Sequence, residues 1–175
     1  LLDATAGPGV GDPYTAPAPS RPYLRDVGAK PTTLRIAISS KTPNGAEVAP
    51  ECQRVLDETA KLCADLGHEV TETDPEIDGE AVVPTFLTLM AANTVVNLSN
   101  HPTAGGPARE DEVERVTWAC YEMGRRVSGA DYARATQAAH RIGRQMAAFH
   151  QDYDVLLTPG LATPPVKLGW LDMMM

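Results

Sequence analysis

Residues 33–74 constrain the fold of this chain more than any other stretch. Thr33–Ser39 reads TLRIAIS, in which leucine or isoleucine stands at every second position, as in a β-strand. Pro50–Leu66 then has apolar residues at spacings of three and four, with Gly67 just beyond its end, and HEVTETDP follows as a second strand. Strand, helix and strand within about forty residues form a right-handed crossover with parallel strands. The chain is therefore predicted to have an α/β fold.

Residues 84–151 are predicted to be a helical segment. Pro84–Ser99 is apolar on most of its circumference, so it is expected to pass through the interior. Glu110–Val127 carries one apolar stripe, and the next helix starts at Ser128 and Asp131, which have the spacing of a capping box. These last two helices are expected to pack together as a pair in a globular core rather than as a coiled coil.

The run Asp154–Thr158 is short and apolar, which predicts a central strand ended by Pro159. In open α/β sheets the ligand crevice lies beyond the carboxyl ends of the strands. The Thr158–Pro159 corner and the proline-rich loop after it are therefore candidates for a pocket wall. At the other end of the chain, residues 1–32 form a Gly/Pro-rich strap that is entered from the last turn of a helix at Leu1–Ala6.

Composition excludes several classes of partner. The 175 residues carry a net charge of −8 without a dense basic run, so nucleic acid is not expected to bind. The longest apolar runs are interrupted by Thr and Asn and fall short of the ~20 residues of a membrane span, so no membrane partner is expected. Cys52 and Cys63 lie about 16 Å apart on one predicted helix, too far to form a disulfide. The odd cysteine count favours a reduced, cytoplasmic location.

The sequence Ser39-Ser40-Lys41 is the first catalytic candidate, because some hydrolases use a lysine base that acts through a second serine. Neighbouring strand residues point to opposite faces, so these three side chains are not expected to converge. A solvated strand end is the preferred interpretation. The alternative, a catalytic role, is kept as a hypothesis.

No metal or cofactor is predicted. The glycines of residues 7–11 lack the third position of a dinucleotide loop, and His-Glu-x-x-His and Cys-x-x-Cys are missing from the sequence. The amide of Asn93 lies in an almost wholly apolar helix, so it needs a partner if it is buried. A bond to the backbone is the commoner explanation, and lining a polar pocket is the functional one. The roles of Trp118 and Cys120 are open in the same way.

Four segments taken in order carry a family resemblance: LLDATAGPGVGDPY, LRIAIS, CADLGHEVTETDP and DYDVLLTPGLATPP. They resemble the middle and later part of the amidase signature family over nearly the entire chain. None is a catalytic motif, so the likeness rests on order and spacing. LATPPVKLGWLD is similar to the branch that contains hydrolases of nylon oligomers and cyclic amides. The resemblance implies a mixed β-sheet flanked by helices on both faces, incomplete here, with residues 1–175 forming part of a single amidase domain.

The resemblance also implies hydrolysis of carboxamide C–N bonds through a serine nucleophile, a second serine held by a cis peptide and a lysine base, without a cofactor. In the family these groups precede the point that corresponds to Leu1. Gly105-Gly106 in this chain is followed by Pro107 rather than by serine. No catalytic residue is therefore assigned within this chain, which is expected to be an interior piece of the enzyme and inactive alone.

Position within the family suggests Asn93, Trp118, Cys120 and Thr158 as substrate-binding wall residues, with a small-molecule amide as the ligand. A competing hypothesis from another class is a noncatalytic α/β ligand-binding or interaction module. The oligomeric state is left open, with a homodimer as one candidate. The isolated segment is expected to be poorly stable, because it would expose sheet edges and helix faces.

Overall fold

The computed structural model describes residues 1–100 and 108–171, which fall into two compact units, Leu1–Thr33 and Leu34–Met175. The first unit holds the short helix α1 (Leu2–Thr5) and the 3-10 turn η1 (Tyr23–Arg25). The Asp3 carboxylate accepts hydrogen bonds from the N–H groups of Tyr23 and Leu24 at 2.6 and 2.9 Å. The Asp3 side chain thus holds the end of the Gly/Pro-rich strap close to its beginning.

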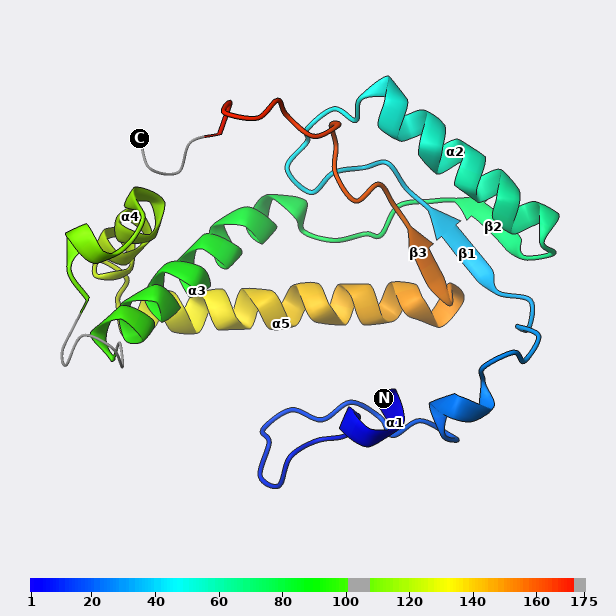
Figure 1. The fold of residues 1–175 in the computed structure, drawn as a ribbon, viewed down its shortest axis with the longest axis horizontal. Coiled ribbons are helices and arrows are strands. Elements are labelled where there is room, and N and C mark those ends of the chain that lie inside the picture. The colour runs from blue at the N-terminus through cyan, green and yellow to red at the C-terminus, as the bar shows by residue number, and fades with distance from the viewer. Residues whose placement is uncertain (101–107, 172–175) are drawn as a thin grey trace. The chain divides into compact units, whose positions relative to one another are not determined.

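The second unit is built on a sheet of three parallel strands in the order β2-β1-β3 (Figure 1). The strands are β1 (Arg35–Ile38), β2 (Glu69–Glu72) and β3 (Val155–Leu157), and α2 (Pro50–Asp65) connects β1 to β2. The predicted strand–helix–strand unit is confirmed. The mixed character that the family resemblance implies is not seen in these three described strands, which are all parallel.

Within the described chain β3 lies at an edge of the sheet, because β1 is the middle strand and β3 pairs with β1 alone, and its predicted central position stays a prediction for the complete sheet. Ile36 and Ala37 are both buried and point to opposite faces, so both faces of β1 are covered. Val155 on β3 is 38% exposed. An apolar run indicates that a strand can be buried, but it carries no information about the order of the strands.

The helix α3 (Gly79–Ser99) begins five residues before the predicted start, and Pro84 lies inside it. Its first turn is held by the Asp78 carboxylate, which accepts from the Ala81 N–H at 3.3 Å. The prediction that this segment passes through the interior is wrong for the described chain, since only Ala91 and Leu98 are buried. Apolar residues around a whole helix permit burial, but other elements must supply the cover.

By length and composition alone, α3 is also apolar enough to cross a membrane. The expectation that no stretch approaches this length is therefore wrong. It counted uninterrupted apolar runs, whereas threonine and asparagine only dilute the mean hydropathy of a helix that carries one charged residue, Glu80. A core helix of a soluble protein meets the same criterion.

The predicted helix Glu110–Val127 is shorter in the structure. Its first turn is the 3-10 helix η2 (Glu110–Glu112), and the α-helix α4 spans Arg115–Gly124. The Glu112 carboxylate accepts from the Arg109 N–H at 2.8 Å, which closes the first turn separately from the helix. An apolar stripe in the sequence does not reveal such a break, because a 3-10 turn and an α-helical turn can both place their apolar residues on the same face.

The helix α5 (Gly129–Asp152) starts at the predicted capping box. Ser128 Oγ accepts from the Asp131 N–H and the Asp131 carboxylate accepts from the Ser128 N–H, both at 3.1 Å. The expected packing of this helix on the preceding one is wrong. Instead, α4 and α5 each pack along α3 (Figure 1).

The contact between α3 and α4 depends on a glycine. A side chain added at Gly124 would place its Cβ 2.1 Å from the Ala91 carbonyl oxygen and 2.7 Å from Val95 Cγ2. Gly124 is buried, and Ala91 is 0% exposed. The backbones of the two helices can approach this closely only because position 124 has no side chain.

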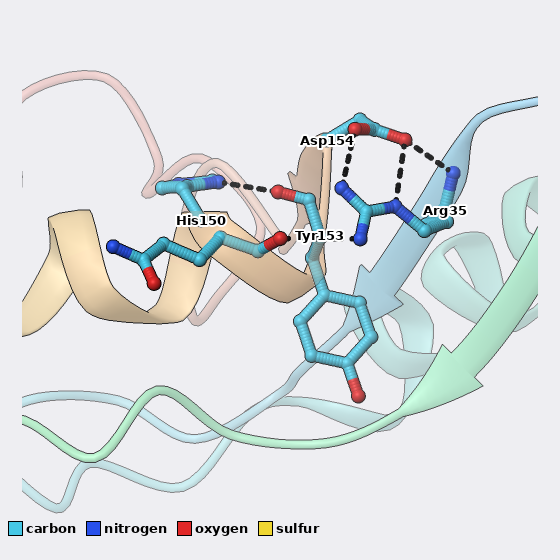
Figure 2. A network of polar contacts seen from close by, with 5 residues as sticks. Arg35, His150, Tyr153 and Asp154 are labelled. Carbon is cyan, nitrogen blue, oxygen red and sulfur yellow. Dashed lines mark hydrogen bonds and ion pairs between the residues drawn. The ribbon is translucent and has the colours of Figure 1, made fainter.

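The amino end of the sheet is held by an ion pair between Arg35 and Asp154, drawn in Figure 2. The guanidinium donates to the two carboxylate oxygens at 2.8 and 3.3 Å, and the Arg35 N–H donates to the same carboxylate at 2.8 Å. The guanidinium also donates to the Gln151 carbonyl at 3.1 Å. The clamp therefore fixes β1 against the junction of α5 and β3.

Replacement of Gly124 by alanine is expected to destabilise the fold by about 1–3 kcal/mol or more, because the new methyl group overlaps the backbone of α3. Gly143→Ala on α5 is the matched control, since nothing lies within 4 Å of its added Cβ. The control is expected to be stabilising by about 0.5–1 kcal/mol, because alanine is the better helix former. Thermal unfolding followed by circular dichroism checks both. Equal effects of Gly124→Ala and Gly143→Ala on the unfolding temperature would contradict the close approach of α3 and α4.

Hydrogen bonds from the Arg35 side chain and N–H lower the pKa of Asp154 from 3.8 to about 2, and those from Ser128 do the same for Asp131. Both carboxylates therefore contribute stability that is present above the unfolded pKa and is lost as the pH falls through the folded pKa. We expect the free energy of unfolding to fall between about pH 4 and about pH 2. Chemical denaturation across this range should show a smaller pH dependence in Asp154→Asn. The matched control is Asp65→Asn on α2, which removes an equal charge but leaves the contact between Arg35 and Asp154 in place.

Candidate functional site

A cavity of about 920 Å³, which we call cavity A, lies at the carboxyl edge of the sheet. Its lining comes from Leu156 of β3, from the segments that follow the three strands, from the first turns of α3 and from one residue of α5. The lining residues are Ser39, Lys41, Thr42, Pro43, Asn44, Gly45, Pro75, Ile77, Gly79, Glu80, Val83, Pro84, Met146, Leu156 and Thr158.

A second cavity of about 590 Å³, cavity B, lies between α2 and the proline-rich loop that follows β3. Leu157 lines cavity B and its neighbour Leu156 lines cavity A, as expected for side chains that alternate across a strand. Met146 of α5 borders cavity A, so α5 lies on the face of the sheet opposite α2. Helices thus flank both faces of the sheet, as the sequence predicted.

Segment 41–45, which follows β1, forms one wall of cavity A. The Thr42 hydroxyl donates to the Ala46 carbonyl at 2.7 Å, and the Ala46 N–H donates to the Asn44 side chain at 3.2 Å. The wall rests on the start of α3, because a Cβ at Gly79 would lie 2.9 Å from the Pro43 carbonyl oxygen. The wall is a closed turn in direct contact with a helix.

Ser39 anchors the beginning of this wall. Its side chain is buried, its hydroxyl donates to the Asp74 carboxylate at 2.6 Å, and its Oγ accepts from the Lys41 N–H at 3.1 Å. The expectation of a solvated strand end is therefore wrong for Ser39. The catalytic hypothesis gains no support either, because no hydrogen bond joins the Lys41 ammonium to Ser39 or Ser40 in the described chain.

The polar groups of cavity A that remain available to a ligand are few. Among the described residues, the Lys41 ammonium, the Glu80 carboxylate and the Thr158 hydroxyl make no hydrogen bond or ion pair with the protein. The rest of the lining is largely apolar, and it includes Ile77 and Met146. The Asn44 side-chain oxygen accepts from Ala46, and its NH2 group has no protein partner among the described residues. The cavity therefore offers an aliphatic surface with one cation, one carboxylate, one hydroxyl and one amide NH2 group.

Of the four predicted wall residues, the structure brings only Thr158 to this edge, where it lines both cavities. Asn93 lies on α3 and is exposed, and its amide donates to the Leu89 carbonyl at 2.7 Å, which is the commoner of the two alternatives considered for it. Trp118 and Cys120 lie on α4. Trp118 stacks on Tyr121 with 4.8 Å between the ring centroids, and Cys120 is a half-buried free thiol. Their roles in a pocket stay predictions.

Sequence reasoning missed the bond between Ser39 and Asp74. Asp74 lies in the acidic stretch TETDPEIDGE, and carboxylates in such stretches are normally solvated. The available signal was positional: each residue follows one of two neighbouring parallel strands, and such strands end at the same edge of the sheet.

The residues that the structure describes include no group of three or more His, Cys, Asp or Glu side chains that could hold a metal ion. His101 and the Gly105-Gly106-Pro107 sequence lie outside the described residues. A cavity with one ammonium, one carboxylate, one hydroxyl and one amide can bind and orient an organic ligand, but it contains no activated nucleophile in the described chain.

Comparison with known proteins assigns the chain to a family. The family model described as Amidase matches residues 1–174. The chain is 27% identical over 175 residues to the 6-aminohexanoate-cyclic-dimer hydrolase of Pseudomonas sp. strain NK87, covering 98% of this chain and 36% of that protein.

Two solved structures share the fold. That of 6-aminohexanoate cyclic dimer hydrolase complexed with substrate gives a TM-score of 0.85 at 26% identity, covering 96% of this chain and 36% of the other. That of a bacterial aryl acylamidase gives 0.71 at 16% identity, covering 84% and 31%, a likeness of fold alone. The chain thus spans about a third of the length of the relatives that it matches, and over the matched length it belongs to the amidase family.

Proposed function

We propose that this chain is one part of a carboxamide hydrolase and that cavity A receives part of the amide substrate. The observation that supports this most is the match of residues 1–174 to the amidase family, together with a cavity at the carboxyl edge of the sheet. Ligands of open α/β sheets bind at this edge.

In the proposed reaction a serine hydroxyl attacks the amide carbonyl, the amine leaves with a proton, and water then hydrolyses the acyl-enzyme to a carboxylic acid. The nucleophile belongs to polypeptide outside these 175 residues. Two observations support this assignment. The chain covers 36% of the hydrolase from Pseudomonas, and the Ser39 hydroxyl is already bonded to Asp74.

The exposed apolar faces of the second unit support the same proposal. Six of the nine buried apolar residues among those described are alanines, whereas large side chains remain open. Phe86 and Val96 on α3 are 61% and 56% exposed, Leu62 on α2 is 56% exposed, and Leu66, the C-cap of α2, is 68% exposed. Apolar surface of this extent is normally covered in a native protein, and the remaining polypeptide of the hydrolase is the proposed cover.

The proposed substrates are aliphatic amides, linear or cyclic. The lining of cavity A is mostly apolar, and the described residues contribute no aromatic side chain to it, which suits a chain or ring of methylene groups. The relative that acts on 6-aminohexanoate cyclic dimer is named for such a ring. The three free cysteines of the described chain support a reduced, cytoplasmic location.

We expect the full-length protein to open the ring of 6-aminohexanoate cyclic dimer to the linear dimer or to release amine from a linear aliphatic amide, and to release amine more slowly from an aryl acylamide. The 175-residue chain alone should release none, because it lacks the nucleophile. Liquid chromatography of the products checks both. If the full-length protein binds these amides without cleaving any, the noncatalytic module is the better description. Activity of the short chain would point back to Ser39 and Lys41.

Thr158→Phe in the full-length protein is expected to raise KM about tenfold, because the larger side chain occupies cavity A, while kcat changes less. Thr163→Phe is the matched control, since Thr163 lines cavity B but not cavity A. Steady-state kinetics with the best amide distinguish the two variants. An equal increase of KM in Thr158→Phe and Thr163→Phe would show that the substrate does not bind in cavity A.

A further inference from the structure

Ser39 is the one polar side chain that is buried among the described residues, at 5% exposure. A buried hydroxyl is costly unless it is hydrogen-bonded. Ser39 uses both capacities of its hydroxyl, donating to Asp74 at 2.6 Å and accepting from the Lys41 N–H at 3.1 Å. The first bond is short and involves a carboxylate, which makes it stronger than a bond between neutral groups.

These bonds connect the ends of all three strands. The Ser39 N–H donates to the Leu157 carbonyl of β3 at 3.1 Å, while the hydroxyl reaches Asp74 beyond β2. The Thr73 N–H donates to the Ile38 carbonyl at 3.1 Å and brings the segment after β2 alongside. One residue thus fixes the carboxyl edge on which cavity A is built.

The same residue sets the direction in which wall segment 41–45 leaves the sheet. The Lys41 N–H is bonded to the Ser39 hydroxyl, and two residues later the Pro43 carbonyl lies against Gly79. Loss of the bond at the Lys41 N–H would therefore let segment 41–45 move, with only the contact of Pro43 with Gly79 left to hold it. Such a movement would change the width of cavity A.

We propose that Ser39 and Asp74 are a positioning pair that holds segment 41–45 as a wall of cavity A and thereby sets the affinity for the substrate. The pair acts through the wall and does not itself touch the reacting atoms, since the Ser39 hydroxyl donates its proton to Asp74. The inference rests on the proposed function only where affinity is measured as KM.

The test compares Ser39→Ala, Asp74→Ala and the double variant in the full-length protein, with Ser40→Ala as the control. We expect each single variant to raise KM about tenfold, with kcat within about threefold, because one hydrogen bond that sets the wall is lost. The double variant should be no worse than Ser39→Ala, since both changes remove one interaction. Ser39→Thr keeps the hydroxyl and should restore most of the affinity.

Amide hydrogen exchange gives a second readout that needs no activity. Exchange at the Lys41 N–H and along segment 41–45 should accelerate in Ser39→Ala and Asp74→Ala but not in Ser40→Ala. An unchanged KM together with unchanged exchange would overturn the proposal, as would a kcat that falls while KM stays constant. If the wild-type protein cleaves no amide, the proposed function fails, and exchange alone still decides whether the pair holds the wall. Should Ser39→Ala not fold, Asp74→Ala decides.

Discussion

The second unit depends on the strand β1. Both edges of β1 pair with other strands, both of its faces are covered, and polar contacts hold both of its ends. Its neighbours β2 and β3 complete the backbone hydrogen bonds, and Ala37 at its centre is 0% exposed. At the amino end Arg35 binds Asp154, and at the carboxyl end Ser39 binds Asp74. The two polar contacts have different consequences. The first fixes the start of a strand far from the cavity, whereas the second shapes the edge where a ligand would bind.

The position of Ser39 explains why a serine next to a lysine in sequence is not a catalytic pair. The hydroxyl proton is held by the Asp74 carboxylate, and it is the Lys41 backbone N–H, not the ammonium, that the Ser39 oxygen accepts. A nucleophilic serine needs a base that takes its proton and an open path to the substrate. Ser39 is only 5% exposed, and among the described residues the Lys41 ammonium makes no hydrogen bond to it, so Lys41 does not serve as its base. In the proposed enzyme this part of the chain therefore shapes the binding site, while the chemistry belongs to residues elsewhere.

Local patterns in the sequence were enough to predict β1, α2, β2 and the Ser128–Asp131 capping box, because periodicity and capping depend on neighbouring residues. They failed where distant elements decide. Pro84 looked like a helix start, yet Asp78 caps the helix a turn and a half earlier. The break before α4 and the edge position of β3 depend on packing partners that the sequence does not name. For the site, the predicted corner at Thr158 lies at cavity A, whereas the Ser39–Asp74 bond requires knowing that β1 and β2 end side by side.

The central claim is that this chain forms a wall of the binding site, while the nucleophile lies elsewhere in the enzyme. Mapping the acylated residue by mass spectrometry tests this claim most directly. The full-length protein would be mixed with an amide substrate, quenched in acid during turnover and digested. The account predicts an acyl group on a serine outside residues 1–175 and none on Ser39 or Ser40. Acylation of either of these two serines would contradict it.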